Sequence, residues 1–299
     1  MPPRDPTVDR SHVDPRRPSV IRRFLMWWFD PPNSPWVSAN IAVDVTAARA
    51  YLDQLEPDAD GRRPSLQHLL AGAVGRTLRA WPMANARIVG RRIVPQDRVG
   101  VAMPVNLLGH QAGGTRELGM VLVEDAGRAS LRDLAGRTRQ TVEHERAGQS
   151  DNAFFRWMLR IAKDAPEPVM WRTLDALDRA RRSGVVEARL HPLLPVTTGL
   201  TNPGAAIREE PGVLFRGASV NLPDKLVHVG TLWGVSAAQD EVVPVDGVPS
   251  VRPMLPVLLV FDHRLIDGVV ASRVLLHFSR ILQDPASTFG PQGRRVARD

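Results

Sequence analysis

The stretch that decides the fold is VLLVFDHRLIDGVVASRVLLHF, residues 257–278. Its first five residues are apolar without interruption, which predicts a strand buried on both faces. Asp262, His263 and Arg264 then interrupt the run, and from residue 269 apolar side chains recur at helical spacing. His263 is therefore predicted to lie where a buried strand turns into a helix. An imidazole held rigidly at such a junction can act as a general base near neutral pH.

The same residues also permit a structural interpretation. A histidine at a strand end is often only hydrogen-bonded in place, and Asp267 is of the residue type that caps helix N-termini. A metal site is a third alternative, but only two possible ligands lie close by and the sequence supplies no obvious third. From the segment alone, the catalytic and structural interpretations both stay open.

The composition limits the chemistry that the chain can perform. It has 299 residues, 43% of them hydrophobic and 24% charged, which is typical of a globular protein. It contains no cysteine, which excludes thiol nucleophiles, thiolate metal ligands and disulfides. Any reactive thiol must therefore arrive on a substrate.

The charge and the hydropathy indicate partners and location. A formal net charge of +7 favours anionic partners such as phosphorylated cofactors. No nucleic-acid-binding motif accompanies this charge, so we do not expect nucleic acid as a partner. No window approaches the ~18 apolar residues of a membrane-spanning helix, and residues 1–20 do not resemble a signal peptide. We expect a cytoplasmic protein without a transmembrane segment.

The pattern along the chain predicts one α/β domain at residues 21–285, built around a mixed sheet. A disordered arm is expected at residues 1–20 and a disordered tail at 286–299. Strand-like runs occur at 36–45, 92–107, 117–125 and 196–261, and helical periodicity at 65–81, 130–147 and 269–282.

A variant helical segment is predicted at about residues 153–183, where aromatic residues such as Phe154 and Trp171 alternate with arginines. One interpretation is a lid over an apolar acyl group, or a surface that meets lipid. The other is an amphipathic hairpin that packs on the core, which we favour because no long unbroken basic amphipathic helix is present.

The motif Asp262-His263-Arg264-x-x-Asp267-Gly268 resembles the signature of the dihydrolipoyl acyltransferase (E2) catalytic domain of 2-oxo acid dehydrogenase complexes. It is also similar to the His-x-x-x-Asp-Gly motif of chloramphenicol acetyltransferases. The resemblance extends over about residues 20–285. Further segments that carry it are Arg22-Arg23, residues 81–86, the Thr201-Asn202-Pro203-Gly204 turn, and residues 229–230, 245–247 and 252–254.

The resemblance implies a chloramphenicol acetyltransferase-like, CoA-dependent acyltransferase fold, an α+β two-layer arrangement with helices packed on a mixed sheet. It also implies transfer of an acyl group between a thioester and an acceptor. By this analogy His263 deprotonates the thiol of coenzyme A or dihydrolipoamide, and the Thr201 hydroxyl stabilises the oxyanion. Asp267 would form an ion pair with Arg22 or Arg23.

Other residues would support the site. By the same resemblance Asp262, Arg264 and Gly268 shape the loop that carries the histidine, and Asn202 and Gly204 shape the turn that presents Thr201. The family places its active site between the subunits of a trimer, so a homotrimer or a higher assembly is expected.

The sequence departs from the family pattern in three places. Canonical E2 chains carry a lipoyl domain, for which residues 1–20 are too short, so we expect a lipoyl group on a separate protein or an unrelated acceptor. Thr201 and His263 are 62 positions apart, which indicates an insertion near residues 208–222. Pro203 is unusual in its turn. The alternative function is therefore a non-catalytic, E2-like trimeric scaffold.

Overall fold

The structure is a computed structural model, and it describes most of the chain. The described residues are 35–106, 118–147, 149, 156–157, 166–182, 184, 195–202, 216 and 228–297. The predicted arm at residues 1–20, Arg22, Arg23 and Gly204 lie outside them, as does nearly all of the predicted insertion.

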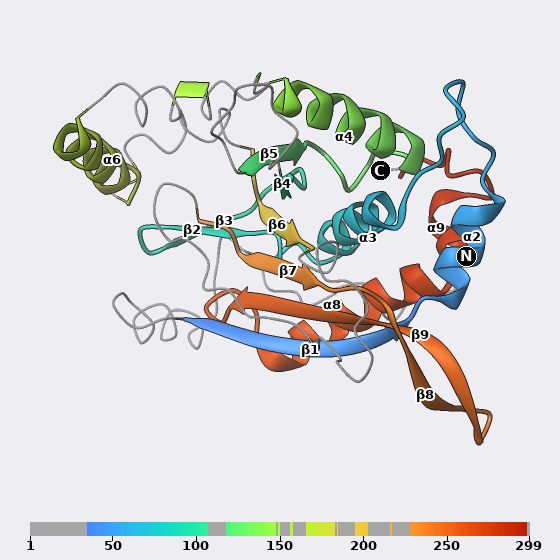
Figure 1. The fold of residues 1–299 in the computed structure, drawn as a ribbon. Helices are drawn as coiled ribbons and strands as arrows, with labels where there is room; N and C mark the ends of the chain where they lie inside the picture. Colours follow the sequence, from blue (N-terminus) through green and yellow to red (C-terminus); the bar gives the residue numbers. More distant parts are fainter. Residues whose placement is uncertain are drawn as a thin grey trace.

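A mixed sheet forms the frame of the described residues (Figure 1). Its strands follow the order β1-β9-β7-β6-β4-β5, with β8 paired to β9. Strand β6 runs parallel to β4 and β7, and the other pairs are antiparallel. The strands are β1 (Trp36–Asp44), β4 (Val101–Asn106), β5 (Leu118–Val123), β6 (Thr198–Thr201), β7 (Thr231–Val235), β8 (Gln239–Val245) and β9 (Val248–Asp262); β2 (Arg87–Val89) and β3 (Arg92–Val94) form a separate hairpin.

Strand β9 is the centre of this sheet. Its second half pairs with β1 on one side and with β7 on the other, so residues 257–261 are buried on both faces. The apolar run therefore has the role that the sequence predicts for it, because a strand with neighbours and packed layers on all sides excludes water from every side chain.

Helices pack on the sheet and on one another. Helix α8 lies against β1 and α3, and α4 lies against β5 and α3 (Figure 1). Trp233 of β7 and Phe278 of α8 meet in the core with ring centroids 4.9 Å apart. The helices are α2 (Thr46–Gln54), α3 (Leu66–Ala80), α4 (Leu131–Arg146), α6 (Glu167–Arg182), α8 (Gly268–Gln283) and α9 (Pro285–Phe289). The mixed sheet with packed helices confirms the predicted fold class.

The carboxy-terminal tail differs from the prediction. Instead of a disordered segment from residue 286, the chain forms α9 and buries Phe289 completely. The Tyr51 hydroxyl donates to the Gly290 carbonyl at 2.8 Å, which ties the tail to α2. Its polar, glycine- and arginine-rich composition suggested disorder, but one large apolar side chain with a place in the core outweighs composition.

The segment predicted at 153–183 is described only in part. Residues 167–182 form α6, which agrees with the predicted helical character, whereas only residues 156–157 of the first part of the segment are described. Trp171 is exposed on α6, while Asp178 and Arg181 are buried. The lid and the packed hairpin both stay predictions.

Strands β8 and β9 continue as a two-stranded arm beyond the rest of the sheet (Figure 1). Asp246 and Gly247 close the arm with positive φ at both positions, as a type I′ turn requires. Val242 and Val251 face each other across it and are 70% and 64% exposed. The arm therefore presents an apolar face to its surroundings.

Candidate active site

The end of β9 is held on both sides. The Asp262 N–H donates to the Gly230 carbonyl at 3.0 Å, and the His263 N–H donates to the Pro35 carbonyl at 2.9 Å. The Leu265 N–H then donates back to the Asp262 carbonyl at 2.9 Å and closes a turn around His263. The imidazole of His263 is thus carried on a fixed backbone and is only partly buried.

The carboxylate of Asp262 shapes this turn from inside. Its Oδ1 accepts the Arg264 backbone N–H at 2.9 Å, and its Oδ2 accepts an Nη2–H of the Arg264 side chain at 2.7 Å. Burial alone would raise the pKa of Asp262, but the hydrogen bonds from His228 and Arg264 outweigh burial and hold this pKa below its ordinary value. Asp262 is therefore an ionised structural group.

His228 completes this buried cluster, although nothing in the sequence around it indicates a role. Its Nε2 lies 2.9 Å from Asp262 Oδ2, its Nδ1 accepts the Ile88 N–H at 3.1 Å, and its ring stacks on Trp36. No motif surrounds His228, and it precedes Asp262 by 34 residues. His228 comes next to Asp262 only because β7 pairs with β9, and no local sequence pattern predicts that pairing.

Asp267 and Gly268 begin α8. Asp267 is the N-cap, and its Oδ1 accepts the Val270 N–H at 2.9 Å. Gly268 is exposed, and a Cβ added to it would meet nothing within 4 Å. The predicted partners of Asp267, Arg22 and Arg23, lie outside the described residues, so the ion pair stays a prediction.

Thr201 and Asn202 lie at the end of β6. The Asn202 side-chain amide donates to Gln67 Oε1 on α3 at 3.0 Å, which fixes this end of the strand on the helix. The Oδ1 of Asn202 is buried and has no hydrogen-bond partner among the described residues. Gly204, the third predicted residue of the turn, lies outside the described residues.

The structure does not bring Thr201 and His263 together within one protomer. Thr201 is level with Gly234 of β7, which is level with Leu258 of β9. His263 follows Leu258 by five residues, so the two site residues are separated by about 16 Å along the strand direction. The sheet also places β7 between them.

The segment at residues 81–86 packs against Gly230, which also contacts Leu265 of the His263 turn. A Cβ on Gly230 would lie 2.5 Å from the Ala86 carbonyl oxygen and 2.8 Å from Leu265 Cδ1, so only glycine allows this contact. Asn85 is buried and donates to the carbonyls of Gln96 and Arg98 at 3.2 and 3.0 Å. These contacts give residues 81–86, one of the segments that carry the family resemblance, a structural role.

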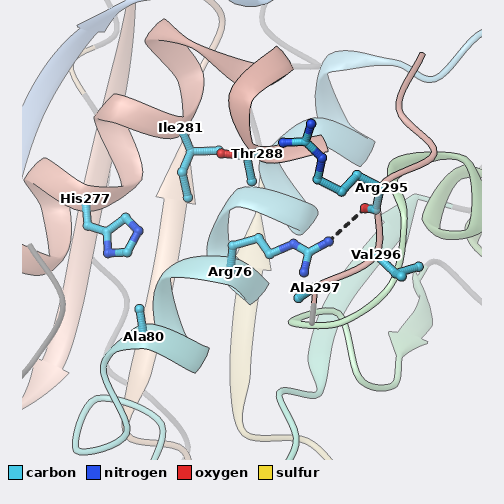
Figure 2. Close-up of a pocket in the computed structure, with 8 residues that line it drawn as sticks. All are labelled: Arg76, Ala80, His277, Ile281, Thr288, Arg295, Val296 and Ala297. Carbon is cyan, nitrogen blue, oxygen red and sulfur yellow. Dashed lines mark hydrogen bonds between the residues drawn. The ribbon is translucent and has the colours of Figure 1, made fainter. Parts of the chain in front are cut away.

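A cavity of about 570 Å³ lies elsewhere, between α3, α8 and the carboxy-terminal segment (Figure 2). Arg76 lines it, but its guanidinium donates to the carbonyls of Gly127, Ala129 and Arg295. Burial, and next the charge of Arg79, lower the pKa of Arg76 to about 10. The cavity contains no residue of the His263 turn, and within the described residues no group of three or more metal-ligating side chains occurs.

Comparison with known proteins agrees with this geometry. The profile of the family "2-oxoacid dehydrogenases acyltransferase (catalytic domain)" matches residues 228–289. Residues 228–289 are therefore similar to this catalytic domain. The match with the acyltransferase profile begins at His228 and ends at Phe289, so it includes the β7–β9 pairing, the His263 turn, α8 and α9.

One curated acyltransferase aligns with most of the chain. The dihydrolipoyllysine-residue acetyltransferase component of the acetoin cleaving system of Bacillus subtilis (strain 168) is 26% identical over 260 residues, which are 85% of this chain. The alignment spans 51% of that relative, so this chain corresponds to about half of its length.

Solved acyltransferase structures share the fold. The cubic core of the pyruvate dehydrogenase multienzyme complex is 18% identical, with a TM-score of 0.60 over 89% of this chain and 87% of that chain. A chloramphenicol acetyltransferase is 15% identical, with a TM-score of 0.51 over 88% and 96%. These likenesses confirm the predicted resemblance and the fold.

Within the described residues, no helix is both long and apolar enough to cross a membrane.

Proposed function

We propose that the chain is a CoA-dependent acyltransferase that moves an acyl group between a thioester and an acceptor thiol. The observation that carries this proposal is the His263 turn, in which a partly buried imidazole follows a fully buried, ionised carboxylate and precedes a capped helix. A general base needs such a fixed backbone and access to its substrate. The family match over this segment supports the same activity.

The proposed reaction uses the substrate's own thiol. His263 accepts the proton of that thiol, and the thiolate sulfur attacks the carbonyl carbon of the thioester. The carbonyl oxygen becomes an oxyanion, which accepts a hydrogen bond from a Thr201 hydroxyl. When the intermediate collapses, the carbon–sulfur bond of the original thioester breaks, and the departing thiolate takes the proton back from His263. A chain without cysteine is suited to this chemistry.

The site requires a second copy of the chain. Thr201 and His263 of one protomer are separated by about 16 Å along the sheet, too far to act on one carbonyl. A site made from His263 of one copy and Thr201 of the next is a head-to-tail arrangement, which closes into a ring. We propose a homotrimer, and the exposed apolar arm around Val242 and Val251 supports such an assembly.

The substrates follow from the same resemblance. We propose acyl-CoA as one thioester, for which the net charge of +7 is favourable, and a lipoyl group on a separate protein as the second substrate. The matched relative is named a dihydrolipoyllysine-residue acetyltransferase component, which supports a lipoyl acceptor. The cytoplasmic location stays a prediction.

The test is acyl transfer from a panel of short and long acyl-CoAs to free dihydrolipoamide. Because total thiol is conserved in this transfer, S-acyldihydrolipoamide and free CoA are separated by chromatography and measured by mass. His263→Ala should lower kcat by about two to four orders of magnitude while the protein stays folded. Binding of CoA without transfer would indicate another acceptor. If CoA neither binds nor reacts, the result favours the scaffold alternative.

A further inference from the structure

We infer that His228, as its neutral Nε2–H tautomer, is a positioning residue that holds the Asp262 carboxylate and thereby the turn that presents His263. This inference rests on the proposed role of His263 as the general base. His228 touches no substrate in this scheme, because it is 3% exposed and acts through Asp262.

The hydrogen bonds of the His228 ring define its tautomer. The Ile88 backbone N–H donates to Nδ1 at 3.1 Å, and a ring nitrogen that accepts a hydrogen bond carries no proton. In the neutral ring the proton is therefore on Nε2, which lies 2.9 Å from Asp262 Oδ2. A doubly protonated ring would direct a second N–H at the N–H of Ile88. The site thus selects one tautomer of the neutral ring.

The ring itself is held in place by its surroundings. It stacks on Trp36 at a centroid distance of 5.8 Å and an angle of 25°. Trp36 pairs with Asp262 across β1 and β9, so the stacking partner belongs to the same row of the sheet. His228 also lies two residues before Gly230, whose carbonyl accepts the Asp262 N–H. The side chain of His228 and the backbone of Gly230 therefore both hold Asp262, and they belong to one short segment, residues 228–230.

The carboxylate transmits this restraint to His263. Asp262 Oδ1 accepts the N–H of Arg264, so the side chain of residue 262 spans residue 263 as an Asx-turn does. Oδ2 is shared by His228 and Arg264. The Arg264 Nε–H also donates to Oδ1 at 3.0 Å, so without His228 the carboxylate keeps its contacts within the turn but loses the donor that ties it to the segment before β7. A displacement of about 1 Å at a catalytic base can cost up to about a hundredfold in rate.

The test compares His228→Leu with His228→Gln. Leucine fills the space but makes no hydrogen bond, whereas the glutamine amide has a donor for Asp262 and an acceptor for Ile88. We expect His228→Leu to lower kcat by about tenfold or more at unchanged KM, and His228→Gln to stay within about threefold of wild type. Equal kcat in both variants and wild type overturns the inference. So does a folded His228→Gln protein with a tenfold loss.

A second measurement does not depend on turnover. In a long-range ¹H–¹⁵N spectrum of the wild type, the ring signals that vanish in His228→Gln belong to His228, and they should show a protonated Nε2 and an unprotonated Nδ1. A protonated Nδ1 overturns the inference. The His263 ring signals should shift in His228→Leu but not in His228→Gln. If the leucine variant does not fold, the glutamine variant and the tautomer decide.

The two proposals fail differently. If CoA neither binds nor reacts, the proposed function is wrong, and if His263→Ala retains full activity, the assignment of His263 as the base is wrong; in either case the spectrum still decides whether His228 positions the turn. If His263→Ala is inactive while His228→Leu is fully active with an undisturbed His263 signal, the function stands and the inference about His228 is wrong.

Discussion

Thr201 and His263 occupy opposite ends of the same sheet: in the strand register Thr201 is level with Leu258, five residues before His263. Neither residue can approach the other without dismantling β7, which pairs with both of their strands. The two residues that the family resemblance assigns to one reaction therefore act together only if different copies of the chain supply them.

This separation predicts complementation between two inactive variants. Thr201→Ala and His263→Ala should each have low activity alone. When the two are co-expressed or refolded together, about one quarter of the sites in a random trimer combine His263 from one variant with Thr201 from the other, because each contribution has a probability of about one half. Acyl transfer by the mixture should therefore exceed that of either variant. A mixed trimer, verified by mass, without recovered activity would exclude the intersubunit site.

Two glycines at the His263 turn should respond oppositely to substitution by alanine. Gly230→Ala brings a Cβ against the Ala86 carbonyl and Leu265, which should lower the free energy of unfolding by about 1–3 kcal/mol. Gly268→Ala meets nothing within 4 Å, and Gly268 has no positive φ, so stability should stay equal or rise by up to about 1 kcal/mol.

Among the described residues of one protomer, nothing therefore requires the residue at position 268 to be glycine. We expect Gly268→Ala to lower kcat/KM by about tenfold, because a substrate or a second copy must approach its backbone closely. Denaturant unfolding and the transfer assay on the same preparations measure both quantities. Full activity in a stable Gly268→Ala protein would show that nothing approaches there.

Asp267 combines a helix cap with a predicted ion pair, and two substitutions separate them. Asparagine caps helices as well as aspartate does, whereas alanine does not, so Asp267→Ala should be about 1 kcal/mol less stable than Asp267→Asn. The loss in Asp267→Asn relative to wild type then measures the charge, including any pair with Arg22 or Arg23. Asp284→Asn at the N-cap of α9 is the matched control. Equal losses at both positions would contradict the ion pair.

The sequence predicted those parts of the molecule whose signal is local. The strand-to-helix junction at His263, the strand at residues 36–44 and the helix at residues 131–146 each depend on a few neighbouring residues, and the structure contains all three. The parts it missed depend on distant contacts. His228 meets Asp262 only through strand pairing, and Phe289 orders the tail only because the core has a place for it.

His68 gives the fold a pH dependence of known sign. It occupies the third position of α3, where its Nδ1 accepts the Ser65 N–H at 2.9 Å and so completes a capping box. Burial, and next the charge of Arg139, lower the pKa of His68 from 6.5 to about 4. Between these values the unfolded chain binds the proton and the folded chain does not, so acid favours unfolding. The stability is complete above about pH 6.5 and is lost as the pH falls towards 4.

Replacement of His68 by glutamine should remove this dependence, because Ser-x-x-Gln is itself a capping box and does not titrate. Between pH 7 and pH 5 the wild type should lose about 2 kcal/mol more of its unfolding free energy than His68→Gln does. Denaturant unfolding of both proteins at one protein concentration measures the difference. Asp262 does not interfere, because a lowered carboxyl pKa acts only below about pH 4. Parallel losses in the two proteins would show that His68 is not held neutral by the fold.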